Sequence, residues 1–344
     1  MAIKKDKITI DDILISNFIF HIVHHDAEEP ILMNKTPIGV HDKFFRERIC
    51  EVVNGNKFLF TEGSPFLDCL KEIERNPMRF DEVSRTLAQK FHKPSEDKDN
   101  RIKQGAMIFI RAVIEDISKY IVIKYDNENV LTYSYKDNEA FLQEISNTFS
   151  KNRSALQKSA IIDLSGNEPI AMLTDKSNPT HVTTFFKSFL GVFRKYTDRD
   201  LTDKVKHAFV NTTKIFKDTL DSSFLSQVTS TFNNLIKNQD DFHAEEFIQA
   251  AFGASYKPEV LMAFEKNLKK EDILGEVFKF DKAYPSPEYM KYRTEEGVII
   301  QLPKNAEDTI KIAYPDNIST TKTVITIETN KIYEDNVKSN KIDS

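Results

Sequence analysis

The chain has 344 residues, of which 40% are hydrophobic, and its 48 Lys and Arg are outnumbered by 53 Asp and Glu, which gives a net charge of −5. At about 150 residues per domain this length allows two domains, and the apolar content excludes an intrinsically disordered chain. The negative charge excludes a protein that coats polyanions through bulk positive charge. A nucleic-acid partner would therefore need a local cationic surface.

The sequence favours a reducing compartment. The N-terminal residues alternate polar with apolar side chains and do not resemble a signal peptide, and every apolar run is far shorter than the ~20 residues of a membrane span. Cys50 and Cys69 stand apart, without a C-x-x-C pairing. We therefore expect a cytoplasmic protein with two inert thiols and no membrane partner.

Residues 1–176 are expected to form an α+β domain with an antiparallel sheet. An apolar run at 13–23 and a short one at 31–33 predict a hairpin, in which His21 and His24 would be solvated imidazoles at the hairpin end rather than metal ligands. Apolar spacing predicts three helices, at 41–54, 64–73 and 80–91, followed by a polar loop at 95–100. Strand-like runs at 106–113, 120–125 and 130–135 then predict an antiparallel meander, and 159–164 with 169–173 predict one more hairpin.

The periodicity changes from two to 3.6 near residue 178, so that 177–275 is expected to be a helical block. The helices expected in it cover 180–190, 200–219, 221–237, 243–252 and 257–270. Strand patterns return at 297–302, 309–313 and 323–328, which predicts a β-rich C-terminal segment over 276–330. The polar residues 331–344 are expected to form a flexible tail.

Motifs for catalysis are absent from the sequence. It contains no G-x-G-x-x-G, P-loop or G-x-S-x-G motif, and its 9 glycines leave little means of bringing the backbone close to a phosphate. A restriction-type nuclease needs an acid-x-Lys on a strand, but Glu96-Asp97-Lys98 lies in a polar loop and Lys124 has no acid two residues before it. We therefore expect no catalytic residues, no metal site and no cofactor.

Positive charge is concentrated in one stretch of about thirty residues. Between residues 187 and 217 the local charge is +5, which leaves −10 for the rest of the chain. The cations that could contact DNA are Lys187, Arg194, Lys195, Arg199, Lys204, Lys206, Lys214 and Lys217. Such contacts to phosphate would give salt-dependent affinity with little sequence specificity. From charge alone, a solvated helical face that keeps the protein soluble is the favoured explanation of the stretch.

A family resemblance favours the DNA-binding interpretation. The strand Ala160-Ile161-Ile162-Asp163-Leu164, followed by a short strand and a Phe-rich helix that ends in Phe189-Leu190-Gly191, resembles the bacterial nucleoid-associated protein family of the NdpA type. The segments 105–110 and 297–300 also match that family in order and spacing, and the resemblance spans roughly residues 8–330. It implies a cytoplasmic protein of the nucleoid that binds DNA without strong sequence preference and has no assigned enzymatic activity. Related domains occur beside phage-defence genes, so the resemblance also implies a possible defence role.

Three hypotheses follow from the sequence. The first is a non-enzymatic, nucleoid-associated homodimer that binds duplex DNA through the cationic stretch. The second is an interaction module for a protein partner, such as a DNA-processing enzyme or a phage-defence protein. The third is a cryptic metal-dependent nuclease.

Overall fold

In the computed structural model the chain forms two compact units, Met1–Tyr284 and Pro285–Ser344. The structure describes residues 8–24, 28–35, 37–92, 104–126, 128–136, 139–149, 152, 155–284, 289–303, 309–313 and 322–329. The expected loop at 95–100 and tail at 331–344 lie outside these residues. The expected boundaries at 176 and 275 both fall inside the first unit and stay predictions.

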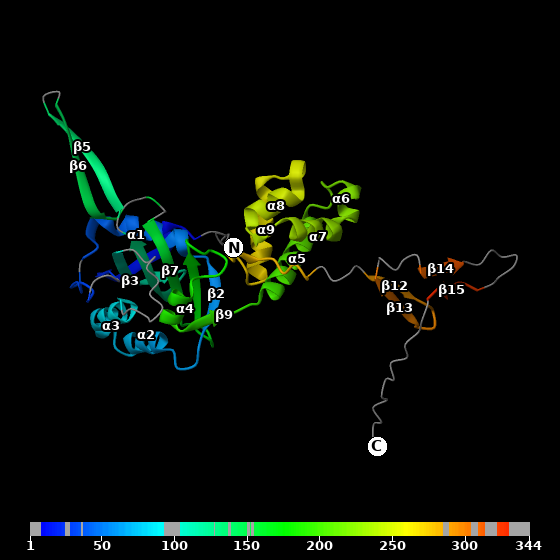
Figure 1. The fold of residues 1–344 in the computed structure, drawn as a ribbon, viewed down its shortest axis with the longest axis horizontal. Coiled ribbons are helices and arrows are strands. Elements are labelled where there is room, and N and C mark those ends of the chain that lie inside the picture. The colour runs from blue at the N-terminus through cyan, green and yellow to red at the C-terminus, as the bar shows by residue number, and fades with distance from the viewer. Residues whose placement is uncertain are drawn as a thin grey trace, which may run out of the picture. The chain divides into compact units, whose positions relative to one another are not determined.

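A seven-stranded antiparallel sheet is the centre of the first unit (Figure 1). Its strands lie in the order β1-β3-β4-β7-β8-β2-β9. They are β1 (Ile13–Val23), β2 (Asn56–Phe60), β3 (Gly105–Ile114), β4 (Ile117–Asp126), β7 (Leu156–Asp163), β8 (Ile170–Asp175) and β9 (Val192–Arg194). Strands β3, β4, β7 and β8 follow one another as a meander, while β2 inserts between β8 and β9 from far upstream in the sequence.

Helices cover both faces of this sheet because successive side chains of its strands alternate between two apolar cores. On β4, for example, Tyr120 and Val122 belong to one core and Ile121 and Ile123 to the other. The first core contacts α2 (Pro65–Arg75), α3 (Phe80–His92) and α4 (Thr184–Leu190), and the second contacts α1 (Asp42–Val52). Figure 1 shows α1 on one side of the sheet and the other three helices on the opposite side.

The pairing of the predicted third meander strand differs from expectation. This run forms β5 (Glu128–Lys136), which pairs with β6 (Glu139–Thr148) in a separate two-stranded hairpin, and this hairpin projects from the sheet (Figure 1). The strand that continues the meander beside β4 is β7. The prediction that 130–135 is a strand is thus confirmed. The prediction that this strand follows 120–125 in the meander was wrong, because strand periodicity does not specify the partner strand.

The expected helical block is present as a third apolar core rich in phenylalanine. Its helices are α5 (Asp198–Ile215), α6 (Ser222–Ser226), α7 (Val228–Asn238), α8 (Ala244–Phe252) and α9 (Pro258–Lys270). A two-stranded ribbon of β10 (Asp241–Phe242) and β11 (Phe278–Lys279) closes the block. Six phenylalanines, including Phe209, Phe232 and Phe247, are completely buried in it.

The second unit contains two short antiparallel hairpins. One joins β12 (Tyr289–Arg293) to β13 (Ile299–Pro303), and the other joins β14 (Ile310–Ala313) to β15 (Val324–Ile327). Together the two units confirm the α+β class and the order of a mixed sheet region, a helical block and a β-rich segment. Within the described parts of the chain, no helix has both the length and the apolarity to cross a membrane.

Candidate nucleic-acid interface

Helix α5 presents one fixed face to solvent. It begins with a capping box, in which Asp200 N–H donates to Thr197 Oγ1 (3.1 Å) and Thr197 N–H donates to the Asp200 carboxylate (3.0 Å). Its apolar face, including Leu201 and Phe209, is completely buried in the third core. The opposite face is therefore held outward, and rotation of the helix would expose the core.

Four of the eight predicted cations lie on or directly after this outward face. Arg199 and Lys206 are seven residues apart and share one side of the helix, and Lys214 lies two turns further on. The Arg199 side chain is 61% exposed, with its nearest acidic partner, Asp281, at 3.6 Å. Lys206 lies 5.5 Å from the centre of the Tyr284 ring, and both Lys214 and Lys217 are exposed.

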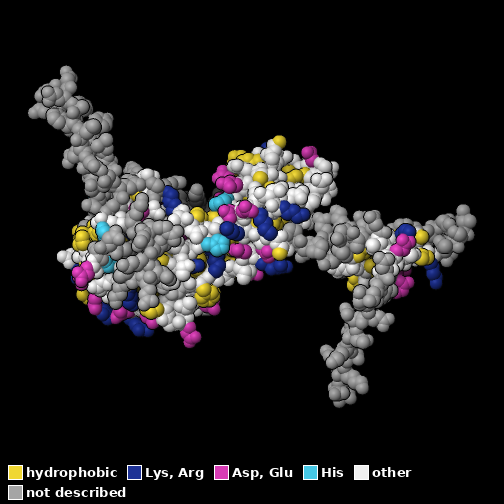
Figure 2. All heavy atoms as spheres, in the orientation of Figure 1, with side chains coloured by type: hydrophobic (Ala, Val, Ile, Leu, Met, Phe, Trp, Pro, Cys, Tyr) yellow, Lys and Arg dark blue, Asp and Glu magenta, His cyan; other side chains and the backbone are white. Residues whose placement is uncertain are grey.

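The space-filling view shows charged side chains of both signs on one face of the helical block. Lys and Arg side chains gather over the helical block around α5, with acidic and histidine side chains among them (Figure 2). On α5 itself, the acid Asp203 accepts a hydrogen bond from Tyr284 Oη and lies 3.8 Å from His207 Nε2. The surface is thus a cationic face interrupted by acids rather than a continuous basic groove.

Three further predicted cations contact carboxylates or carbonyls where the helical block meets the sheet. Arg194 is largely buried, with its guanidinium 5.4 Å from the centre of the Phe58 ring and Nη2 2.7 Å from Glu276 Oε2. Burial raises the pKa of Glu276 to about 7 and lowers that of Arg194. Lys195 Nζ donates to Asp272 Oδ2 (2.8 Å). Lys204 Nζ donates to the Glu271 carbonyl (2.8 Å).

Lys187 is separated from these residues by its position in the fold. It is half-buried on α4, whose residues Phe186 and Leu190 are buried in the first core against the sheet. Helix α4 ends at Gly191, which adopts φ +65° and starts the turn into β9. The predicted set is therefore divided between α4, the sheet–block junction and the outward face of α5, and which of its members contact phosphate stays a prediction.

Sequence reasoning missed Lys57, which lies in the middle of these charges. Strand β2 pairs with β9, and Lys195 N–H donates to the Lys57 carbonyl (3.0 Å). Lys57 Nζ reaches the carboxylate and the carbonyl of Asp272, and Lys57 N–H donates to Glu276 Oε1 (2.9 Å). The short run 56–60 was not predicted as a strand, so no signal connected Lys57 with residues about 140 positions later in the chain.

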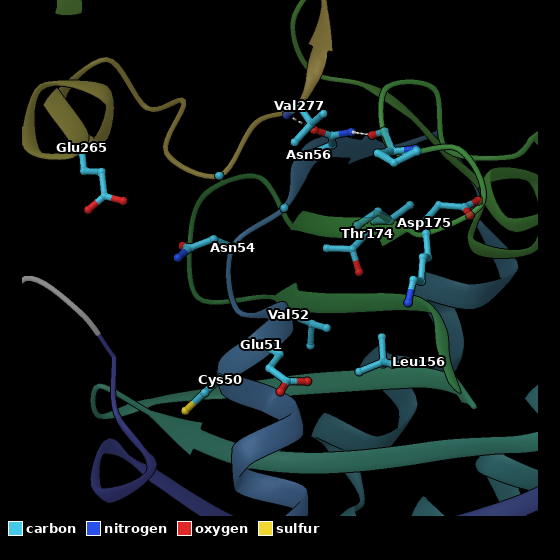
Figure 3. A pocket seen from close by; sticks show the side chains of 15 residues that line it. Cys50, Glu51, Val52, Asn54, Asn56, Leu156, Thr174, Asp175, Glu265 and Val277 are labelled. Carbon is cyan, nitrogen blue, oxygen red and sulfur yellow. Dashed lines mark hydrogen bonds between the residues drawn. The ribbon is translucent and has the colours of Figure 1, made fainter. Parts of the chain in front are cut away.

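A cleft of about 770 Å³ opens where α1, β2 and the turn before β11 meet (Figure 3). Its charged lining residues are the acids Glu51, Asp175 and Glu265 and a single cation, Lys176. Asp175 is buried, with Lys158 Nζ 2.7 Å from its carboxylate. The charge of this lining disfavours a phosphate backbone, so the cleft does not extend the cationic face.

Of the residues considered for a nuclease, the structure describes only Lys124. Lys124 is completely buried and paired with Asp126 at 2.8 Å, and Glu96-Asp97-Lys98 lies outside the described residues. In the described ranges no three His, Cys, Asp or Glu side chains are grouped so that they could hold a metal ion. His21 is buried and hydrogen-bonded to Ser84 Oγ (3.0 Å), so the prediction of a solvated imidazole was wrong for this residue.

Comparison with known proteins identifies a protein family but no curated relative. No curated protein matches the chain. The family model described as nucleoid-associated protein YejK matches residues 19–321. This match covers the sheet except the first residues of β1, the helical block and most of the β-rich segment. The chain therefore belongs to the nucleoid-associated protein YejK family.

Proposed function

We propose that this protein binds duplex DNA without strong sequence preference, through phosphate contacts made by the outward face of α5 and by Lys217. The observation that carries the proposal is the fixed orientation of this helix. Its apolar side is buried in the phenylalanine core, so Arg199 and Lys214 are held toward solvent, with Lys206 half-buried at the edge of the same face. Membership of a nucleoid-associated family supports DNA as the polyanion.

Lysine and arginine side chains contact phosphates without reading base edges, which accounts for the expected lack of sequence specificity. Four cations that each neutralise one phosphate give a log–log salt slope of about −3.6, because each contributes about 0.9 on B-DNA. The affinity would then fall about 150-fold between 50 and 200 mM salt. Such binding is moderate at low salt and weak at physiological salt.

The test replaces Arg199, Lys206, Lys214 and Lys217 together by Gln and measures fluorescence anisotropy of a labelled 20-bp duplex over this salt range. We expect the variant to lose most of its affinity and its salt slope. A matched control replaces four exposed lysines of the sheet region by Gln and removes the same charge: Lys35, Lys43, Lys71 and Lys90. Equal affinity and slope in the α5 variant and the wild type would refute the site.

Several finer properties belong to the same proposal. We expect a homodimer, which light scattering of the purified protein tests, and localisation on the nucleoid, which a fluorescent fusion tests.

We expect no catalysis, so that plasmid incubated with the protein and Mg²⁺ or Mn²⁺ stays intact, and cleavage would favour the nuclease hypothesis instead. A defence role would appear as reduced phage plating on cells that carry the gene.

The second unit favours an alternative function as an interaction module for a protein partner. Val298, Ile299, Val324 and Ile327 are each about half exposed on its hairpins. Two-stranded hairpins of this length are marginally stable alone, and exposed aliphatic side chains favour contact with another protein. Recovery of one stoichiometric partner after nuclease treatment, lost when residues 285–344 are deleted, would support this alternative.

A further inference from the structure

One carboxylate at the junction of sheet and helical block collects donors from three segments of the chain. Asp272 Oδ2 accepts hydrogen bonds from Lys195 Nζ (2.8 Å) and Tyr196 Oη (2.6 Å), while Lys57 Nζ contacts Oδ1. Partial burial by itself would raise the pKa of Asp272, but these hydrogen bonds outweigh it and hold the pKa far below its usual range. The three donors thus form a cradle built for an anionic oxygen.

The backbone at Asp272 does not explain why an aspartate is present. Asp272 follows the last turn of α9 with φ +61°, and Ile273 N–H donates to the Leu268 carbonyl (2.9 Å), which closes the helix as a Schellman motif. Glycine is the usual residue at this position because a Cβ is disfavoured in the left-handed region. The feature that distinguishes aspartate from glycine at this position is therefore its carboxylate, which occupies the cradle.

The cradle has the chemistry of a phosphate site. Ammonium and hydroxyl groups donate to phosphate oxygens as they do to carboxylate oxygens. Lys204 Nζ lies 4.9 Å from the centre of the Tyr196 ring, which brings a further positive charge and connects the cradle to α5. The Asp272 side chain is 46% exposed, whereas those of Lys57 and Lys195 are only 14% and 22% exposed. The carboxylate can therefore leave toward solvent while the donors stay in place.

We propose that Lys57, Lys195 and Tyr196 form a phosphate-binding cradle that Asp272 occupies in the free protein, and that a backbone phosphate of DNA takes its place on binding. The exchange conserves charge, because a phosphodiester carries one negative charge, as the carboxylate does. The partly buried lysines keep an anionic partner throughout the exchange, so the free-energy cost of an unpaired buried charge does not arise. This inference rests on the proposed DNA binding and assigns it a second contact beside the outward face of α5.

The test replaces Asp272 by Gly, which tolerates φ +61° and empties the cradle. The matched control is Asp116→Gly, because Asp116 also has a positive φ (+65°), is exposed in the turn between β3 and β4, and carries the same charge. We expect Asp272→Gly to bind the 20-bp duplex several-fold more tightly than Asp116→Gly, because the same phosphate then enters the cradle without displacing a carboxylate. The salt slope should be steeper by about 0.9, because no released carboxylate offsets the charge of that phosphate.

A second measurement does not involve DNA. Inorganic phosphate should raise the melting temperature of Asp272→Gly more than chloride does at equal ionic strength. We expect no such difference between the two salts for Asp116→Gly or for the double variant Asp272→Gly/Lys195→Gln. If Asp272→Gly does not fold, Asp272→Asn, which removes the charge and keeps an acceptor oxygen, is compared with Asp116→Asn in the same two assays.

The outcomes separate the two proposals. Equal affinity, slope and phosphate response in the Asp272 and Asp116 variants would show that Asp272 is only a structural clamp and would overturn the cradle. Failure of the wild type and of every variant to bind DNA at 50 mM salt would refute the proposed function. In that case the phosphate-dependent melting temperature still decides whether the cradle binds an oxyanion.

Discussion

Protonation of His21 is expected to destabilise the fold in mild acid. This side chain of β1 is completely buried, and its Nδ1 accepts a hydrogen bond from Met33 N–H (3.1 Å). The ring proton of the neutral imidazole is therefore assigned to Nε2, which lies 3.0 Å from Ser84 Oγ. Ser84 Oγ in turn donates to the Asp81 carbonyl (2.7 Å). A second proton on Nδ1 would point at the Met33 N–H and break this arrangement.

The size of the effect follows from the pKa. Burial, with a smaller contribution from the positive charge of Arg85, lowers the pKa of His21 from 6.5 to about 4. The folded state thus favours the neutral ring, so this contribution to stability is fully present above pH 6.5 and is lost as the pH falls toward 4. Proton linkage gives a loss of about 2 kcal/mol between pH 7.5 and 5.0, and of about 3 kcal/mol below pH 4.

Urea unfolding of the wild type and of His21→Gln at pH 7.5 and 5.0 measures this effect. Glutamine keeps a donor and an acceptor but does not titrate in this range. We expect the free energy of unfolding to fall by about 2 kcal/mol more in the wild type than in the variant. Equal losses in both proteins, or a His21 pKa near 6.5 by NMR titration, would refute the reasoning.

Two further predictions concern the junctions of the fold. Gly191→Ala should lower the free energy of unfolding, measured by urea titration, by about 2 kcal/mol, because a Cβ at φ +65° would lie 2.6 Å from Ser64 Oγ, the side-chain cap of α2. The control is Gly63→Ala, where φ is +69° but the space around a Cβ is open. This substitution should lower the free energy of unfolding by about half as much. Glu276 has its pKa raised by burial to about 7, so its ionisation opposes folding, and stability from this group falls as the pH rises from 4.5 to 7. Urea unfolding at pH 5 and 8 should show this dependence in the wild type and not in Glu276→Gln, and an equal dependence in both would contradict it.

The helices and most of the strands could be predicted because their signals are local. The apolar spacing of α5, the proline at the start of α2 and the glycine that ends α4 each act within a few residues. Net charge is also additive along the chain, so the cationic stretch was visible without a structure. The family resemblance from Ala160 to Gly191 likewise depended on the order of residues alone.

Only the tertiary structure decided which charges meet. The pairing of β2 with β9 brings Lys57 to Lys195, and the end of α9 brings Asp272 to both, although these residues are far apart in the sequence. The same contacts separate the cations paired at the junction from the cations on the outward face of α5. A count of charges along the sequence does not distinguish these two groups. Electrostatic interactions depend on distance and burial in three dimensions, and a linear sequence specifies neither before the chain has folded.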